Sequence, residues 1–284
     1  MASLTPPPLS AIDGSVHRAL AEDLGDAGDI TTDSVIPPAQ QAAGVIAARK
    51  AGVLAGLPVG LRVFQIIDPG VRINPRLQDG ARLAPGDVVL EIFGAARSLL
   101  KAERVALNFL GHLSGVATAT AEIAAAIAHT KARVCCTRKT TPGLRLFEKY
   151  AVLCGGGVNH RMGLYDAILI KDNHIAAAGG VAAAIRAAKA RPGPRVKLEV
   201  EVDTLAQLEE AMGEGVDQVL LDNMTPAQLK EAVARVAGRA VTEASGSITK
   251  ATAPAIAESG VDLMSVGWIT HSAPCLDLGL DFTA

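Results

Sequence analysis

Charged, amide and glycine residues follow a series of short apolar segments in the second half of the chain. If those segments are parallel strands, their carboxyl ends share one edge of a sheet, which is where ligands gather in such folds. We therefore expect an active site at that edge. The residues are Thr137, Arg138, Lys139 and Thr140; Lys171, Asp172, Asn173 and His174; Glu199, Glu201 and Asp203; Asp222 and Asn223; Ser245, Gly246 and Ser247; and Gly267 with Trp268.

Positive charge is concentrated among these residues. Cations 4 Å apart repel each other by roughly 1 to 4 kcal/mol per pair, depending on screening. Such crowding is tolerated when a ligand with several negative charges binds. Arginine forks match planar carboxylates and phosphates, whereas lysine acts as a point charge. The residues that predict a polyanionic ligand are Arg138, Lys139, His160, Arg161 and Lys171.

Two acidic residues, Glu201 and Asp222, stand on neighbouring predicted strands. Carboxylates beside a phosphate site usually hold Mg²⁺, and they can also stabilise a cationic transition state. The turn at Ser245–Ser247 and the later Gly267 have the residue types of a backbone-amide cup for a phosphate monoester. Taken singly, each of these features also fits a solvated charge or an ordinary turn. Their repetition on successive strands favours the functional interpretation.

The elements that must position these residues follow from the apolar pattern. Strands are expected at 133–137, 167–171, 196–202, 218–222, 240–245 and 262–267, with helices between them at 180–190, 204–215, 226–238 and 250–260. This alternation predicts a parallel sheet, and its short period favours a barrel. Before it, a long helix is expected over 99–130, weakened near Gly111 and Gly115. The first half mixes strands at 71–75 and 86–94 with helices within 17–37 and at 57–67.

Composition excludes several classes of protein. The chain has 284 residues, of which 49% are hydrophobic and 20% charged, enough for a substantial core in one large or two ordinary domains. A net charge of −2 argues against nucleic-acid and membrane-surface binding. No apolar run reaches about 18 residues, and the proline-rich residues 1–10, expected to form a loose arm, do not resemble a signal peptide. We expect a cytoplasmic protein whose four cysteines are buried free thiols.

One region resembles a known family. The segment CTRKTTPGLRLFEKYAVLCGGGVNHRMGLYDAILIKDNHI is similar to the signature region of quinolinate phosphoribosyltransferases. The resemblance continues through HRALAEDLGDAGDITTD, AERVALNFLGHLSGVAT, LEVEVDTL, VLLDNM, EASGSI, GVDLMSVGWITHS and LDLGLDF, and so covers nearly the whole chain. It implies transfer of phosphoribosyl from phosphoribosyl pyrophosphate to quinolinate with decarboxylation, on the route to NAD.

The resemblance also implies an α/β architecture. An N-terminal α/β sandwich domain is expected at 1–112, with residues 272–284 packing back on it. An open α/β barrel of the type II phosphoribosyltransferases, with fewer than eight strands, is expected at 113–271. A homodimer is implied, in which Arg104 reaches across to complete the partner's active site.

Matching motifs carry the family's roles onto this chain. Those implied for substrate binding are Arg104, Thr137, Arg138, Lys139, His160, Arg161, Lys171, Glu201 and Asp222; for catalysis, Lys139, Lys171, Glu201 and Asp222; for Mg²⁺, through water, Glu201 and Asp222; and for the 5′-phosphate, Ser245, Gly246, Ser247, Gly267 and Trp268. Either Lys139 or Lys171 could deliver a proton after decarboxylation. Ser247 stands where the family commonly has glycine, and would be strained at positive φ. Trp268 replaces a smaller residue and is large enough to crowd the phosphate cup.

Three other functions fit part of this residue pattern. A molybdenum-transport-associated protein shares the fold and the TRKTTPG-like segment, but the intact IKDNH motif disfavours it. A barrel aldolase could use Lys171 as a Schiff base, which borohydride trapping would detect. A non-catalytic phosphometabolite sensor would bind ligand without turnover, although such a protein has no need for both Glu201 and Asp222.

Overall fold

The computed structural model describes residues 4–283, which form two compact units. Unit 1 contains the chain up to Ala119, Leu146–Gly156 and the segment from Ser272, and unit 2 contains Thr120–Arg145 and Gly157–His271. Helix α4 (Ala96–Ala126) runs without a break through residue 112, where we expected the domain boundary.

Unit 1 is built on an antiparallel sheet of order β12-β1-β5-β3. Ile12, Val16 and Leu20 recur every fourth residue on α1 and are buried, and α1 packs against α3. Its elements are α1 (Leu9–Leu24), α2 (Ile30–Val35), β1 (Gln41–Ala48), β2 (Gly52–Val53), α3 (Leu57–Ile67), β3 (Arg72–Pro75), β4 (Arg82–Leu83), β5 (Val88–Ala95), most of α5 (Arg145–Cys154) and β12 (Leu278–Thr283). Helix α1 starts at Leu9, so the expectations of a loose arm over residues 1–10 and of a first helix from residue 17 were wrong; residues 1–3 lie outside the described part.

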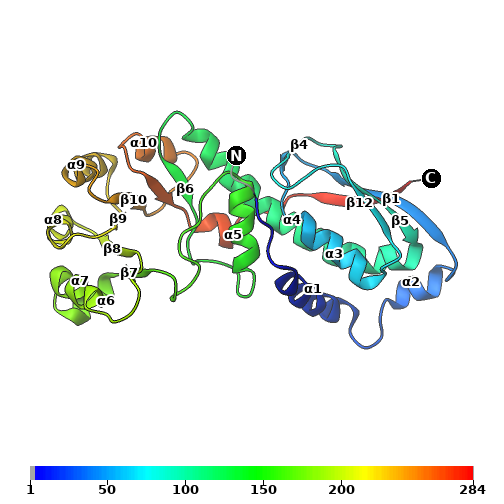
Figure 1. Ribbon diagram of the computed structural model, residues 1–284. Coiled ribbons are helices and arrows are strands. Elements are labelled where there is room, and N and C mark those ends of the chain that lie inside the picture. The colour runs from blue at the N-terminus through cyan, green and yellow to red at the C-terminus, as the bar shows by residue number, and fades with distance from the viewer. Residues whose placement is uncertain (1–3, 284) are drawn as a thin grey trace. The chain divides into compact units, whose positions relative to one another are not determined.

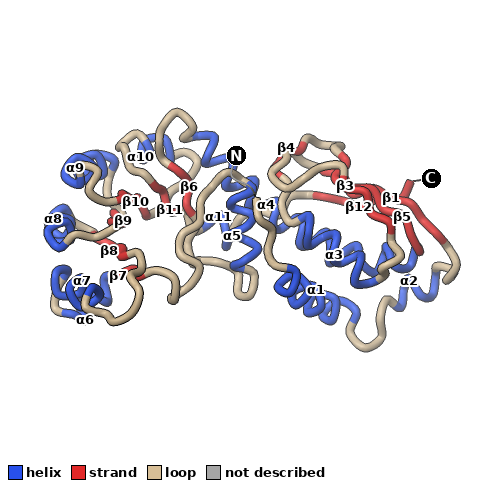
Figure 2. Tube along the Cα trace, in the orientation of Figure 1, coloured by secondary structure: helices blue, strands red, loops and turns tan. Residues whose placement is uncertain are grey.

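Unit 2 is a parallel sheet of order β6-β11-β10-β9-β8-β7 with helices around it (Figures 1 and 2). Among residues 4–283 no strand pairing joins β6 to β7, so the barrel is open. All six expected strands are present, each at or within its expected range. The elements are β6 (Arg133–Cys135), β7 (Ile168–Ile170), α6 (Asp172–Ala178), α7 (Val181–Lys189), β8 (Leu198–Val202), α8 (Leu205–Glu214), β9 (Gln218–Asp222), α9 (Pro226–Val236), β10 (Val241–Ser245), α10 (Ala253–Ala257), β11 (Leu263–Ser265) and α11 (Trp268–His271).

Local sequence explains where the barrel helices begin. Thr204 and Thr225 each accept a hydrogen bond from the backbone N–H three residues later, and the glutamine at that position bonds back to the cap. These reciprocal capping boxes satisfy N–H groups that have no partner inside the helix. As a result β8 and β9 end directly before a helix, with Glu201 and Asp222 at or near their carboxyl ends.

The long helix α4 is continuous, so the expected weakening near Gly111 and Gly115 was wrong. Glycine serves close packing at these positions instead. The backbone N–H of Leu276 donates to the Gly111 carbonyl at 2.9 Å. A Cβ added at Gly115 would lie 2.1 Å from the Pro274 carbonyl oxygen.

Gly115→Ala should therefore destabilise the protein by about 3 kcal/mol, because a backbone atom must move to admit the methyl group. Chemical denaturation measures this change. The matched control is Gly213→Ala on α8, where an added Cβ meets nothing within 4 Å, and a gain of about 0.5–1 kcal/mol is expected. Equal effects of the two substitutions would contradict the steric explanation.

Two further expectations from composition concern membrane spans and cysteines. None of the helices formed by residues 4–283 is long and apolar enough to cross a membrane. The four cysteines are free, but Cys275 is exposed, so the expectation that all of them are buried was wrong.

Candidate active site

A cavity of about 260 Å³ opens at the carboxyl edge of the parallel strands. Eight of the residues singled out in the sequence line it, together with Leu169, Leu220, Glu243 and Ser265. Those eight are Thr137, Arg138, Lys139, His160, Arg161, Lys171, Glu201 and Ser245. Residues separated by more than a hundred positions therefore meet in one place, as expected from the shared edge of parallel strands.

Two guanidinium groups in this cavity lack part of their hydrogen bonding. Among residues 4–283, the buried side-chain nitrogen and oxygen atoms without a hydrogen-bond partner are the Nε atoms of Arg138 and Arg161. Burial lowers the pKa of Arg161, and the neighbouring charge of Arg138 lowers it further. Unsatisfied buried donors and like-charge repulsion are both costly, and a bound anion removes both costs. Within the described residues, this pair of arginines is the strongest indication of an anion-binding site.

A third arginine holds the two cationic loops together. Arg145 donates through Nε to Thr140 Oγ1 at 3.0 Å and through a terminal nitrogen to the Met162 carbonyl at 3.2 Å. Asp166 accepts the backbone N–H groups of Met162 and Gly163 at 2.6 and 2.9 Å. Because of these bonds, the segments that carry Arg138 and Arg161 are fixed before any ligand arrives.

Lys171 and Glu201 form an ion pair at the cavity wall. Lys171 Nζ lies 2.5 Å from Glu201 Oε2, and the side chains are 44% and 14% exposed. The backbone N–H of Lys171 donates to His174 Nδ1 at 2.9 Å, which makes His174 a helix-capping residue of α6. The pair places one positive and one negative charge at neighbouring strand ends, β7 and β8.

The expected phosphate loop follows β10, next to the end of β9. Gly246 has φ +108°, and an added Cβ would meet Asn223 Oδ1 at 2.2 Å, so this position requires glycine. Asp222 pairs in register with Ser245 and accepts from Asn223 Nδ2 at 2.7 Å. Asp222 and this turn border the strand edge, but the cavity lining does not include Asp222, Gly246, Ser247, Gly267 or Trp268.

Ser247 has φ +47°, so the sequence-based expectation of strain at this serine is met. Ser247→Gly should stabilise the protein by about 0.5–1 kcal/mol, since glycine occupies this region without a steric penalty. Thermal denaturation measures the gain. Ser247→Ala retains a Cβ and should give no gain; a gain with alanine equal to that with glycine would disprove the strain.

Trp268 has a structural contact that the sequence did not reveal. Its Nε1 donates to the Ile248 carbonyl at 2.9 Å, which ties the start of α11 to the loop after β10. Gly267 lies against Lys139, where an added Cβ would come within 2.9 Å of Lys139 Cδ. Trp268 therefore holds the expected phosphate loop.

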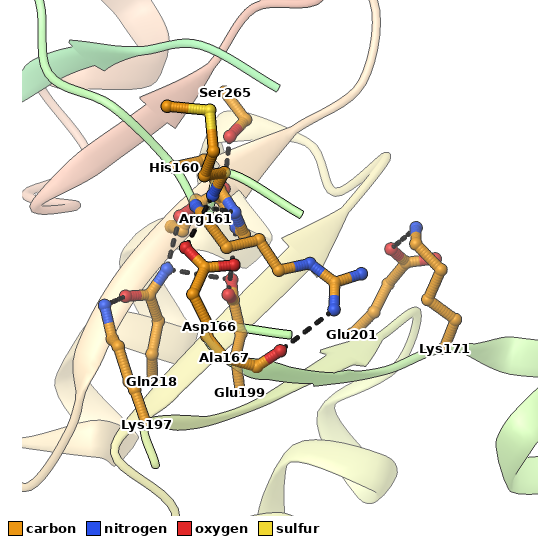
Figure 3. A network of polar contacts seen from close by, with 12 residues as sticks. His160, Arg161, Asp166, Ala167, Lys171, Lys197, Glu199, Glu201, Gln218 and Ser265 are labelled. Carbon is orange, nitrogen blue, oxygen red and sulfur yellow. Dashed lines mark hydrogen bonds and ion pairs between the residues drawn. The ribbon is translucent and has the colours of Figure 1, made fainter. Parts of the chain in front are cut away.

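Sequence reasoning gave no role to Gln218, Glu243 and Ser265, which are buried together with Glu199. Glu243 and Ser265 line the cavity, and Figure 3 shows Gln218, Ser265 and Glu199 in one polar network. The available signal was a polar residue at every second position of consecutive strands, which points those side chains to one face. Burial and repulsion by Glu199 raise the pKa of Glu243 to about 7. These residues thus surround the inner end of the cavity with hydrogen-bonding groups.

A second cavity of about 410 Å³ lies at the opposite, amino end of the strands. Three of its charged groups have partners in the chain: Arg195 pairs with Asp217 at 2.8 Å, and Lys189 donates to the Glu214 carbonyl. Active sites of parallel barrels lie at the carboxyl end. The smaller cavity with the unsatisfied arginines is therefore the better candidate.

Comparison with known proteins identifies the family. The model of the quinolinate phosphoribosyl transferase N-terminal domain matches residues 29–114, and that of the C-terminal domain matches residues 116–281. The chain belongs to the quinolinate phosphoribosyltransferase family. Its mixed α/β fold, with six parallel strands in the C-terminal part, is that of this family's open barrel.

Individual family members are similar over their full length. A nicotinate-nucleotide pyrophosphorylase (carboxylating) of Mycobacterium leprae is 46% identical over 94% of this chain and 95% of its own. A protein of Bacillus subtilis, named a probable nicotinate-nucleotide pyrophosphorylase (carboxylating), is 42% identical over 94% and 92%. The solved structure of NadC from Streptococcus pyogenes superposes with a TM-score of 0.94 at 46% identity, covering 99% of this chain and 100% of that chain.

Proposed function

We propose that the cavity at the carboxyl edge binds quinolinate and phosphoribosyl pyrophosphate. The chain transfers the phosphoribosyl group to quinolinate with loss of CO₂, and forms nicotinate mononucleotide and pyrophosphate in de novo NAD biosynthesis. The observation that carries the proposal is the pair of partly satisfied guanidinium groups, Arg138 and Arg161, in this family's signature region. Quinolinate has two carboxylates on one planar ring, and arginine forks match planar carboxylates.

The proposed roles divide the site by charge. Arg138 and Arg161 bind the quinolinate carboxylates, with Thr137 and His160 beside them. Lys139 and Lys171 bind pyrophosphate as point charges. The turn at Ser245–Ser247, with Gly267 and Trp268, holds the 5′-phosphate. These assignments rest on which residues line or border the cavity and on the motif match.

The proposed reaction has two bond exchanges. The bond between ribose C1 and the pyrophosphate oxygen breaks as the quinolinate ring nitrogen forms a bond to ribose C1. Glu201 stabilises the cationic character at ribose C1. The bond between C2 of the pyridine ring and its carboxylate then breaks. CO₂ leaves, and the electron pair of the bond remains at C2 beside the positively charged nitrogen. Lys139 or Lys171 delivers the proton that C2 takes up. Lys171 acts here as a charged donor paired with Glu201, an arrangement that does not favour a Schiff-base amine.

The carboxylates of Glu201 and Asp222 suit Mg²⁺. They stand near the ends of adjacent strands, and each accepts a hydrogen bond through one oxygen, Oε2 of Glu201 from Lys171 and Oδ2 of Asp222 from Asn223. Mg²⁺ is commonly held by one or two carboxylates while it keeps several waters. When bound, the ion would neutralise the developing charge of pyrophosphate. The chain's own part is to hold these two carboxylates beside Lys171.

We propose that the protein is a cytoplasmic homodimer in which Arg104 completes the partner's site. Arg104 is exposed on α4. Arg104→Ala and Glu201→Gln should each be inactive alone. Mixing them under conditions of subunit exchange should restore about a quarter of wild-type activity, because half of the chains form heterodimers and each heterodimer has one intact site. No recovery in a mixture shown to contain heterodimers would contradict a shared site.

A paired assay tests the reaction itself. Purified protein is supplied with quinolinate, phosphoribosyl pyrophosphate and Mg²⁺, and pyrophosphate and CO₂ are followed together, with nicotinate as the control substrate. Equal release of both products from quinolinate and none with nicotinate supports the proposal. Absence of both products, with protein shown to be folded, would refute it.

A further inference from the structure

A polar network occupies the interior of the barrel, and two of its members, Glu243 and Ser265, line the cavity (Figure 3). Its members are almost inaccessible to solvent: Glu199 is 3% exposed, Gln218 1%, Glu243 0% and Ser265 7%. They come from β8, β9, β10 and β11. Burying polar groups costs several kcal/mol unless each is hydrogen-bonded. Apolar residues would fill this core without that cost, so the network calls for a specific role.

Gln218 connects the two acids. Its Nε2 donates to Glu199 Oε1 at 2.8 Å and also to Glu243 Oε2, while its Oε1 accepts from Lys197 Nζ. Ser265 Oγ donates to the other Glu243 oxygen. With both amide protons and the amide oxygen engaged, the orientation of Gln218 is determined. Burial and the neighbouring charge of Glu199 raise the pKa of Glu243.

His160 ends the network at the cavity wall. Its Nε2 lies 2.9 Å from Glu199 Oε2 and 3.7 Å from Glu243 Oε1. Its Nδ1 accepts the backbone N–H of Arg161 at 2.8 Å. Since Nδ1 accepts this hydrogen bond, the ring proton resides on Nε2 and is directed to Glu199. In this arrangement Nδ1 is an acceptor and Nε2 faces a carboxylate, and the side chain is only 10% exposed.

We propose that Gln218 and Glu243 are positioning residues for substrate binding: together with Glu199 they hold His160 in the neutral Nε2–H form, and His160 in turn holds the backbone that presents Arg161 to a quinolinate carboxylate. This inference rests on the proposed function, because it takes Arg161 as a carboxylate ligand. The Arg161 side chain is further aligned by its bond to the Ala167 carbonyl at 3.1 Å. The buried network therefore acts on the reaction through the geometry of one arginine.

A divalent metal ion is the competing occupant, because ligand atoms of His160, Glu199 and Glu243 lie within 4.8 Å of one another. The hydrogen-bond donors argue against it. Gln218 directs both amide protons at these carboxylates and Ser265 directs its hydroxyl proton at Glu243, so an ion there would face the positive ends of three dipoles.

The test compares Gln218→Met with the matched control Leu221→Met. Leu221 lies on the same strand and is fully buried, but is an odd number of residues from Gln218 and so faces the other side of the sheet. For Gln218→Met we expect the quinolinate KM to rise about tenfold, with the KM for phosphoribosyl pyrophosphate and kcat within about a factor of three of wild type. Leu221→Met should change none of them. An unchanged quinolinate KM in folded Gln218→Met overturns the proposal.

Arg161→Ala separates this inference from the proposed function. If Arg161→Ala leaves the quinolinate KM unchanged, the carboxylate site itself is wrong. If Arg161→Ala raises that KM and folded Gln218→Met does not, the site stands and the positioning role is wrong. Glu243→Gln keeps the shape of the side chain and resembles a protonated acid, so its quinolinate KM should stay close to that of wild type. Glu243→Leu should raise the quinolinate KM as Gln218→Met does.

Two further measurements test the proposal, and the first needs only the wild-type protein. The ¹⁵N spectrum of His160 at pH 7 should show a neutral ring protonated on Nε2; an imidazolium or an Nδ1–H ring overturns the proposal. Both proteins are incubated with Zn²⁺, passed through gel filtration and analysed for zinc. Wild type and Glu243→Gln should retain the same amount of zinc. One equivalent retained by wild type and absent from Glu243→Gln would assign the cluster to a metal instead.

Discussion

Arg138→Ala is expected to raise the quinolinate KM about 100-fold while the protein stays folded. Arg138 lines the cavity, and its Nε is buried without a partner, so the side chain contributes little to the unliganded fold. Loss of a charge-assisted bidentate contact costs about 3 kcal/mol, which corresponds to that factor in binding. Steady-state kinetics with varied quinolinate, together with circular dichroism, measure both parts of the expectation.

Two further variants make this result specific. Arg133→Ala removes an exposed arginine at the first residue of β6, the strand that precedes the Arg138 loop, and should leave KM near wild type. Arg138→Lys keeps the charge but loses the planar fork, and should recover only part of the affinity. If Arg138→Ala has wild-type KM and kcat, the proposed position of the quinolinate carboxylates is wrong.

Glu201→Gln and Lys171→Met are each expected to lower kcat by about 100- to 1000-fold. Lys171 Nζ and Glu201 Oε2 are 2.5 Å apart at the cavity wall. Removal of either partner leaves the other charge unmatched at the position proposed for pyrophosphate and the ribose. Because the two residues act as a unit, the double variant should be little worse than the poorer single variant.

A double-mutant cycle of kcat for the four proteins measures this coupling. Glu231→Gln is the matched control: Glu231 pairs with Arg235 at the same distance of 2.5 Å, but on the exposed surface of α9. That variant should keep wild-type kinetics, since such surface pairs contribute little. Fully additive losses for Lys171 and Glu201 would show that they act independently.

Much of the barrel could be predicted because its strands and helices are marked locally. Apolar runs bounded by capping residues such as Thr204 and Thr225 identify the strand ends, and parallel strands necessarily bring those ends to one edge. Arg138, Lys171 and Glu201 could therefore be placed together from the sequence alone. The polyanionic character of the ligand followed from their charges.

The sequence predicted the long helix α4 but not the reason for its two glycines. Glycine lowers helix propensity, and Gly111 and Gly115 suggested a weak point. The benefit of these glycines lies in the close approach of a segment more than 150 residues away, at Pro274 and Leu276. Local propensity contains no information about such a distant contact.

The sequence by itself determined the family, the order of strands and helices in the barrel, and the charged residues of the site. The tertiary structure alone decided which polar groups are buried and which remain unsatisfied. Gln218 and Glu243 form a network because four strands direct them to one interior, and the Nε atoms of Arg138 and Arg161 lack partners because surrounding chain excludes water there. Burial depends on everything packed around a residue, so neither the hydrogen-bond partners of the His160 ring nor the unsatisfied Nε atoms of the two arginines could be derived from residue type and spacing.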